Sequence, residues 1–117
     1  MDLITVTTKE EVLQAMQKMA SKAEDPKMRK HFEGFDKTLL MTFKDIGLDV
    51  SMVFQEGKAS VTEGTVGTPD LIVTTDSETI LGILNGTVSA TRAAMGGRIK
   101  TKGPVRDLLK LQHLMKA

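Results

Sequence analysis

The sequence predicts an α+β fold, in which a five-stranded, largely antiparallel sheet has helices packed on one face. Apolar residues recur at intervals of three and four near both ends of the chain, a period typical of amphipathic helices. In the middle of the chain they alternate with polar residues, as in half-buried strands separated by short glycine-containing turns. Because the 117 residues contain no linker, repeat or low-complexity tract, we expect residues 1–117 to form a single domain with one core.

The first part of the chain is predicted to be helical. Thr8 and Glu11 have the spacing of a capping box, and the apolar stripe that follows predicts a helix from about Lys9 to Lys22. Asp25 then precedes a proline, which predicts the N-cap and the first residue of a short second helix.

The middle of the chain predicts a sheet. Residues 39–43, 48–54 and 58–63 alternate in polarity and are separated by glycine turns, which predicts a meander of three strands. Residues 64–69 form a connection rich in glycine and threonine. The apolar run that follows, within residues 71–75, predicts a fourth and more buried strand.

Two short helices, a basic strand and a final helix complete the prediction. Thr75 and Glu78 have the spacing of a second capping box, which predicts the start of a helix over residues 78–84, and residues 89–95 have weaker helical signals. In residues 98–102 the basic side chains alternate with Ile99 and Thr101 along a fifth strand. The apolar residues of the final helix span about 220° of its circumference, which is wider than the stripe of an ordinary surface helix. These residues are Val105, Leu108, Leu109, Leu111, Leu114 and Met115. We therefore expect something besides the sheet to cover part of this helix.

The charge distribution along the chain is uneven, and such asymmetry is found both in proteins with an anionic partner and in proteins with a solvated basic face. The net charge is +1, but residues 92–117 hold seven basic residues and one acid, whereas residues 1–91 hold nine and fourteen. Nucleic acid is a distant third hypothesis, because the chain has neither Trp nor Tyr to stack on bases and the final helix is mostly leucine. The absence of cysteine fits a reducing compartment, and with no targeting segment recognised we expect a cytoplasmic protein.

The sequence offers no set of residues suited to ordinary catalysis. His31 and His113 lie far apart, and neither has a carboxylate or a second histidine at a metal-binding spacing. His113 falls among lysines on the polar side of the final helix, where a solvated imidazole is expected. The segment GGRIKTKG, residues 96–103, lacks the glycines of a phosphate-binding loop. We therefore predict no enzymatic activity, no metal and no cofactor.

The chain is rich in methionine and poor in aromatic residues, with eight Met and four Phe. A flexible, polarizable methionine side chain can adapt to a guest molecule or fill gaps in a core that has few rings. Composition alone favours gap filling and leaves both interpretations open.

The segment from Asp70 to Leu114 resembles the signature region of the sterol carrier protein 2 (SCP2) domain. The resemblance is carried by a strand that begins with Asp70, a capped helix over 78–84, a G-[KR]-[LI]-K-x-x-G strand over 97–103, and the K-L-Q run of 110–112. It covers roughly residues 36–115 and implies a helix-covered sheet that encloses an apolar tunnel. Many family members carry a phenylalanine before the glycine-bounded strand, but this chain has Ala93-Ala94-Met95, so the resemblance does not imply sterol specificity.

The resemblance implies non-catalytic binding of a lipid, fatty acid, acyl-CoA or sterol-like molecule, with transfer as an extension of that role. The predicted apolar pocket residues are Met16, Met52, Phe54, Val73, Leu84, Met95, Ile99, Leu108, Leu111 and Met115. Arg98, Lys100 and Lys102 are candidates for contact with an anionic headgroup, although their alternation predicts an outer, solvated face. The alternative is an SCP2-like dimerisation or protein-interaction module. As partners we expect a small apolar molecule, with a homodimer as an alternative, no nucleic acid, and at most a transient membrane-surface contact.

Overall fold

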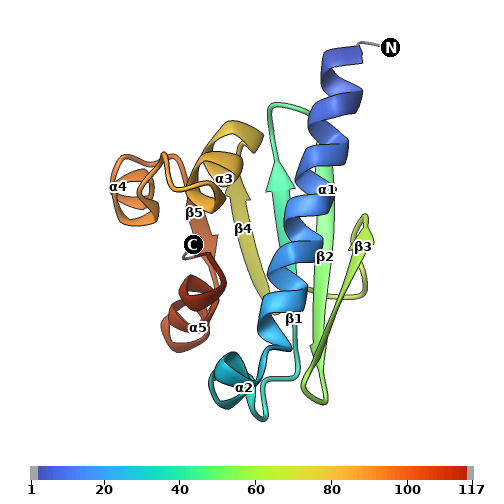
Figure 1. Ribbon diagram of the computed structural model, residues 1–117, viewed down its shortest axis with the longest axis vertical. Helices are drawn as coiled ribbons and strands as arrows, with labels where there is room; N and C mark the ends of the chain where they lie inside the picture. Colours follow the sequence, from blue (N-terminus) through green and yellow to red (C-terminus); the bar gives the residue numbers. More distant parts are fainter. Residues whose placement is uncertain (1–2, 116–117) are drawn as a thin grey trace.

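The computed structural model describes residues 3–115, with the side chains of residues 8–111, 113 and 114. Helices and strands follow one another in the order that the sequence predicts (Figure 1). The elements are α1 (Leu3–Ala23), α2 (Pro26–Phe32), β1 (Lys37–Phe43), β2 (Leu48–Gln55), β3 (Lys58–Glu63), β4 (Leu71–Thr75), α3 (Ser77–Leu84), α4 (Ala90–Met95), β5 (Lys100–Lys102) and α5 (Val105–Met115). Within this described part, no helix is both long and apolar enough to cross a bilayer.

The five strands form one mixed sheet in the order β3-β2-β1-β4-β5. Strand β1 pairs with β2 in antiparallel and with β4 in parallel orientation, so the expectation of a largely antiparallel sheet was wrong. The physical reason is the connection over residues 64–70. It does not turn back as a hairpin but passes behind the sheet in Figure 1, so that β4 begins beside the start of β1.

Ser51 shows how this connection is held. Its hydroxyl donates to the carbonyl oxygen of Gly64 at 2.6 Å and accepts from the backbone N–H of Val66 at 3.1 Å. Ser51 is fully buried although it lies on the outer face of β2, because the connection covers it. A polar residue in an alternating strand pattern is normally expected to be exposed, so this burial is a consequence of the crossover.

The opposite face of the sheet carries the core. Leu39 pairs with Met52 and Met41 with Val50 in the register of β1 and β2, and all four side chains are buried. Helix α1 lies across this part of the sheet, while α3, α4 and α5 lie toward β4 and β5 (Figure 1).

Two predicted helix starts differ from the structure. Helix α1 begins at Leu3, so Thr8 lies inside the helix instead of at its N-cap. Helix α3 is capped by Asp76, whose carboxylate accepts the N–H of Thr79 at 2.8 Å, one residue after the threonine that the capping-box spacing indicates. That threonine, Thr75, donates its hydroxyl to the carbonyl oxygen of Arg98 at 3.0 Å. A spacing of three residues therefore indicates a helix start without fixing the capping residue.

Gly103 ends strand β5 and allows the chain to turn into α5. Its φ is +138°, and a Cβ atom at this position would lie 2.6 Å from Cδ2 of Leu71. Both the backbone conformation and the close approach to β4 require glycine. This gives a physical reason for the second glycine of the motif over residues 97–103.

Candidate functional site

An apolar cavity of about 180 Å³ lies between the sheet and the pair of helices α4 and α5. Its floor comes from β1, β4 and β5, and its walls come from α1, α4 and α5. Thr101 is the polar residue in an otherwise apolar lining. The cavity is therefore suited to a hydrocarbon group and offers few partners to a buried polar group.

Four of the predicted pocket residues line this cavity: Val73, Ile99, Leu108 and Leu111. Val73 pairs with Thr101 across β4 and β5, which places both on the inner face. Leu108 and Leu111 come from the wide apolar face of α5. That they bind a ligand stays a prediction.

Three other predicted residues lie in the solid core. Met16 and Met52 are completely buried and do not line the cavity. Phe54 stacks with Phe32 at a ring-centroid distance of 5.5 Å and lies 5.1 Å from the ring of Phe35. These rings fill the interior near α2, which confines the apolar cavity to the side of β4 and β5.

The remaining predicted pocket residues are dispersed. Leu84 lines a groove of about 500 Å³ between α1 and α3, and Met95, at the end of α4, is 84% exposed. The side chain of Met115 lies outside the part of the chain that the structure describes.

The sequence interpretation missed eight residues that line the cavity. They are Met19, Leu39, Met41, Ala90, Ala94, Thr101, Val105 and Leu109. The best available signal was the pair of alanines, which are four residues apart on α4 and therefore share one helix face. Their small side chains leave space in the cavity that larger ones would fill.

Met19 lies between the cavity and the neighbouring groove. It lines both spaces, and it is only 2% exposed. A methionine side chain has several rotatable bonds, so Met19 is the most adaptable part of the boundary between the two spaces.

The three basic residues proposed for a headgroup do not line the apolar cavity. Lys100 and Lys102 pair with Thr74 and Ile72 and share their outer face of the sheet, as the alternation predicts. Arg98 and Lys100 line a separate polar pocket of about 380 Å³. The carboxylate of Asp45 also lines this pocket and is bound to the start of α3. It accepts a hydrogen bond from the backbone N–H of Ser77 at 3.0 Å and another from the hydroxyl of Ser77.

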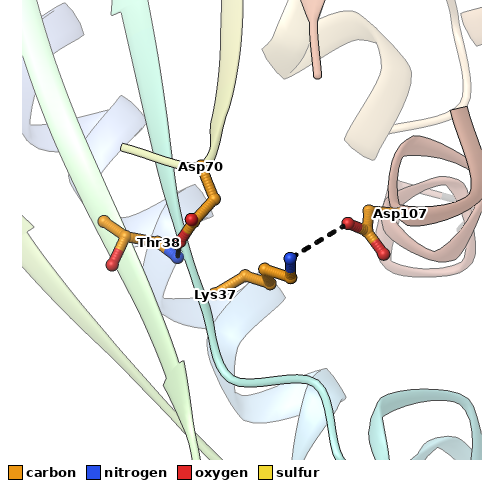
Figure 2. Close-up of polar contacts among 4 residues, drawn as sticks. All are labelled: Lys37, Thr38, Asp70 and Asp107. Carbon is orange, nitrogen blue, oxygen red and sulfur yellow. Dashed lines mark hydrogen bonds and ion pairs between the residues drawn. The ribbon is translucent and has the colours of Figure 1, made fainter. Parts of the chain in front are cut away.

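Helix α5 is tied to the start of β1 by an ion pair. Lys37 Nζ lies 3.7 Å from the carboxylate of Asp107 in the first turn of α5 (Figure 2). Next to it, the carboxylate of Asp70 accepts the N–H of Thr38 at 2.9 Å. The N–H of Asp70 in turn donates to the carbonyl oxygen of Thr38 at 2.9 Å, so Asp70 joins the start of β4 to β1.

The far end of α5 contacts α2 through the two histidines. The rings of His31 and His113 stack with their centroids 4.1 Å apart. The sequence analysis expected a solvated His113 and did not predict this contact. Lys110 Nζ lies 5.2 Å from the ring centroid of Phe35, within reach of a cation–π interaction. Within residues 3–115, no cluster of three or more His, Cys, Asp or Glu side chains could hold a metal ion.

Solved structures of sterol carrier proteins share this fold. A sterol carrier protein domain 2 from Helicoverpa armigera matches with a TM-score of 0.71 and 20% identity, covering 87% of this chain and 82% of that one. A sterol carrier protein 2 like 2 from Aedes aegypti matches with a TM-score of 0.66 and 16% identity, covering 90% of this chain and 96% of that one.

The fold also occurs within a much larger enzyme. A sec-alkylsulfatase from a Pseudomonas species matches with a TM-score of 0.64 and 21% identity over 76% of this chain, but this chain covers only 14% of that enzyme. Comparison with curated proteins gives no match. The model of the SCP-2 sterol transfer family matches residues 8–116, and the chain therefore belongs to this family.

Proposed function

We propose that this protein binds a lipid or another hydrophobic molecule without chemical change, and that it can transfer the molecule between sites. The observation that carries the proposal is the apolar cavity beneath α4 and α5 in a member of the SCP-2 sterol transfer family. The wide apolar face of α5 fits this role. Leu114 is packed in the core and Leu108 lines the cavity, so one helix serves both the protein and its guest.

The size of the cavity indicates how a guest enters. A cavity of about 150 Å³ admits a benzene ring, and sites for larger ligands are typically about 300–1,000 Å³. The cavity of about 180 Å³ therefore holds one end of an acyl chain or one ring. For a longer guest, either α5 moves outward or the Met19 side chain turns and joins the cavity to the groove beside α3.

The free energy of binding is favourable for an acyl chain that enters only in part, or that enters fully when α5 or the Met19 side chain moves. Burying a chain of sixteen carbons contributes roughly 13 kcal/mol at ~0.8 kcal/mol per methylene. Association and ordering cost about 4–15 kcal/mol, so the affinity depends on how much of the chain the protein covers. In this proposal Arg98, Lys100 and Lys102 contact an anionic headgroup only outside the cavity.

No catalytic step is part of the proposal. Among the side chains that the structure describes, the four buried hydroxyl residues, Ser51, Thr75, Ser77 and Thr79, each donate a hydrogen bond within the fold. Such hydroxyls serve the structure and are not free to act as nucleophiles. A cytoplasmic location, favoured by the absence of cysteine, belongs to the same proposal.

Titration with a fluorescent fatty acid tests this function. We expect saturable binding with one site per chain, and displacement by unlabelled fatty acid, acyl-CoA or sterol in an order that identifies the preferred class. Displacement by none of the three, together with no saturable uptake, would contradict the proposal.

A dimerisation module is the second candidate, and the exposure of α5 favours it. Val105 and Leu109 are 71% and 53% exposed, so part of the apolar face of α5 is uncovered in the single chain. Light scattering over a range of protein concentrations tests this alternative, because a monomer at every concentration would exclude it.

A further inference from the structure

Two of the residues that line the apolar cavity carry sulfur. Met41 comes from β1 and Met19 from α1, and both side chains are buried, so solutes dissolved in the surrounding water have little access to them. A thioether is polarizable and takes up an oxygen atom to become a sulfoxide. The rest of the lining is hydrocarbon, apart from Thr101. The two sulfur atoms are therefore the oxidisable groups that a guest in the cavity would meet.

Met41 lies in one row with Thr101 across the inner face of the sheet. Met41 pairs with Val73 in β1 and β4, and Val73 pairs with Thr101 in β4 and β5. All three residues line the cavity. Because neighbouring strands are about 4.8 Å apart, the Cα atoms of Met41 and Thr101 are separated by about 10 Å, with Val73 between them. A guest that lies over Val73 therefore has a thioether on one side and a hydroxyl group on the other.

We propose that this row is a site of oxygen transfer, at which an organic hydroperoxide bound in the cavity oxidises Met41 and, next to it, Met19. The lipid class concerned is the hydroperoxide that forms when an unsaturated acyl chain is oxidised. The inference rests on the proposed function, because a lipid hydroperoxide reaches these sulfur atoms only as a guest in the cavity.

The step needs no further reactant. A lone pair of the sulfur attacks the outer oxygen of the hydroperoxide, the O–O bond breaks, and the proton of the outer oxygen passes to the inner one. Sulfur is oxidised to the sulfoxide, and the hydroperoxide is reduced to the alcohol. The hydroxyl of Thr101 donates a hydrogen bond to the inner oxygen as negative charge develops there. The step is stoichiometric and not catalytic, because each sulfur takes up one oxygen atom.

Three other methionines provide references within the same chain. Met52 is fully buried on the same inner face of the sheet, opposite Leu39, and Met16 is fully buried in α1, but neither lines the cavity. Met95 is exposed and also does not line it. A peroxide dissolved in water should therefore oxidise Met95 first, whereas a peroxide bound in the cavity should oxidise Met41 and spare Met52.

Peptide mapping by mass spectrometry tests the proposal after treatment with cumene hydroperoxide or with hydrogen peroxide. Cumene hydroperoxide carries one aromatic ring, and the cavity of about 180 Å³ exceeds the volume of about 150 Å³ that admits benzene. Transfer of a ring from water to an apolar site enriches it there at least about tenfold. We therefore expect the ratio of sulfoxide at Met41 to sulfoxide at Met95 to be at least about tenfold higher with cumene hydroperoxide than with hydrogen peroxide. Excess palmitic acid should protect Met41 and leave the oxidation of Met95 unchanged.

Substitutions assign the step to its residues. Met41→Leu removes the sulfur, keeps an apolar side chain of similar volume and should slow the formation of cumyl alcohol. Met52→Leu is the matched control, because it removes an equally buried sulfur from the same face of the sheet, and it should leave the rate unchanged. Thr101→Val removes the hydrogen-bond donor and should slow the oxidation of Met41 about fivefold, without changing the oxidation of Met95 by hydrogen peroxide.

Equal oxidation of Met41 and Met52 by cumene hydroperoxide would overturn the proposal, because the oxidant would then reach the whole core and not the cavity alone. Oxidation of Met41 that a bound fatty acid does not slow would also overturn it. Fatty acid uptake without oxidation of Met41 would refute the oxygen transfer and leave the proposed lipid binding intact. Selective oxidation of Met41 over Met52, in a protein that takes up no fatty acid, would support the oxygen transfer and contradict only the proposed function.

Discussion

A larger side chain on α4 that fills the cavity should raise the stability of the protein and lower its affinity for a fatty acid. Ala90 is the first residue of α4, is half-buried and lines the cavity. Ala90→Leu adds three carbon atoms, fewer than the six of the benzene ring that a cavity of about 150 Å³ admits. Complete burial of three carbons contributes up to about 2.4 kcal/mol, and strain from tight packing offsets part of this. We expect the free energy of unfolding to rise by about 1–2 kcal/mol, and the affinity for a fluorescent fatty acid to fall at least about tenfold.

Urea unfolding and fluorescence titration measure the two effects on the same preparation. Thr91→Leu is the matched control, because Thr91 is exposed on the same helix and does not line the cavity. The control should leave fatty acid uptake unchanged. If Ala90→Leu lowered the stability and left uptake unchanged, the space beside α4 would be neither empty nor the binding site.

Three further substitutions test the boundary of the cavity and the attachment of α5 and β4. Met19→Ala should cost about 2–5 kcal/mol of stability and shift the preference toward longer acyl chains, because it joins the cavity to the adjacent groove; an unchanged preference in a chain-length series would contradict this role. Asp107→Asn should change the free energy of unfolding by less than about 1 kcal/mol, because the ion pair with Lys37 is partly exposed. It should nevertheless speed lipid release in stopped-flow measurements, and an unchanged release rate would show that this contact does not restrain α5. Asp70→Ala should lower the free energy of unfolding by about 1 kcal/mol in urea, whereas Asp70→Asn should restore much of it, because the amide oxygen can still accept the N–H of Thr38; equal losses would point to charge instead of this hydrogen bond.

Local patterns in the sequence predict most of the fold. Alternation places Thr101 on the inner face beside Val73 and the lysines of β5 on the outer face, as the pairing shows. The pair Asp25-Pro26 marks the start of α2, where the Asp25 carboxylate accepts the N–H of Lys27 at 2.9 Å. Such features depend on interactions between neighbours in the chain or across one pair of strands, so a single sequence is enough to reveal them.

The mixed sheet could not be predicted in the same way. Whether β4 joins the edge of the meander or enters beside β1 depends on where residues 64–70 cross the sheet, and the sequence of this connection is compatible with either path. The evidence for its course lies in long-range contacts, such as the hydrogen bonds of Ser51 with Gly64 and Val66. The buried Ser51 appears in the sequence as an ordinary outward-facing polar residue.

The position of the cavity also escaped prediction, for a reason of packing. Periodicity shows that Met52 and Val73 both face the interior, but it does not show which part of the interior the protein fills. Phe32 and Phe35 fill the side near Phe54, whereas Ala90 leaves space near Val73. An unfilled volume depends on side chains from many elements, so only the assembled structure locates it.

Native mass spectrometry of the purified chain tests the central claim most directly, because it weighs the protein together with whatever its cavity holds. We predict a population heavier than the bare chain by the mass of one hydrophobic molecule, which appears in an organic extract of the same sample and increases after incubation with fatty acid. The bare mass alone, before and after that incubation, would contradict the claim that the interior beneath α4 and α5 admits a guest.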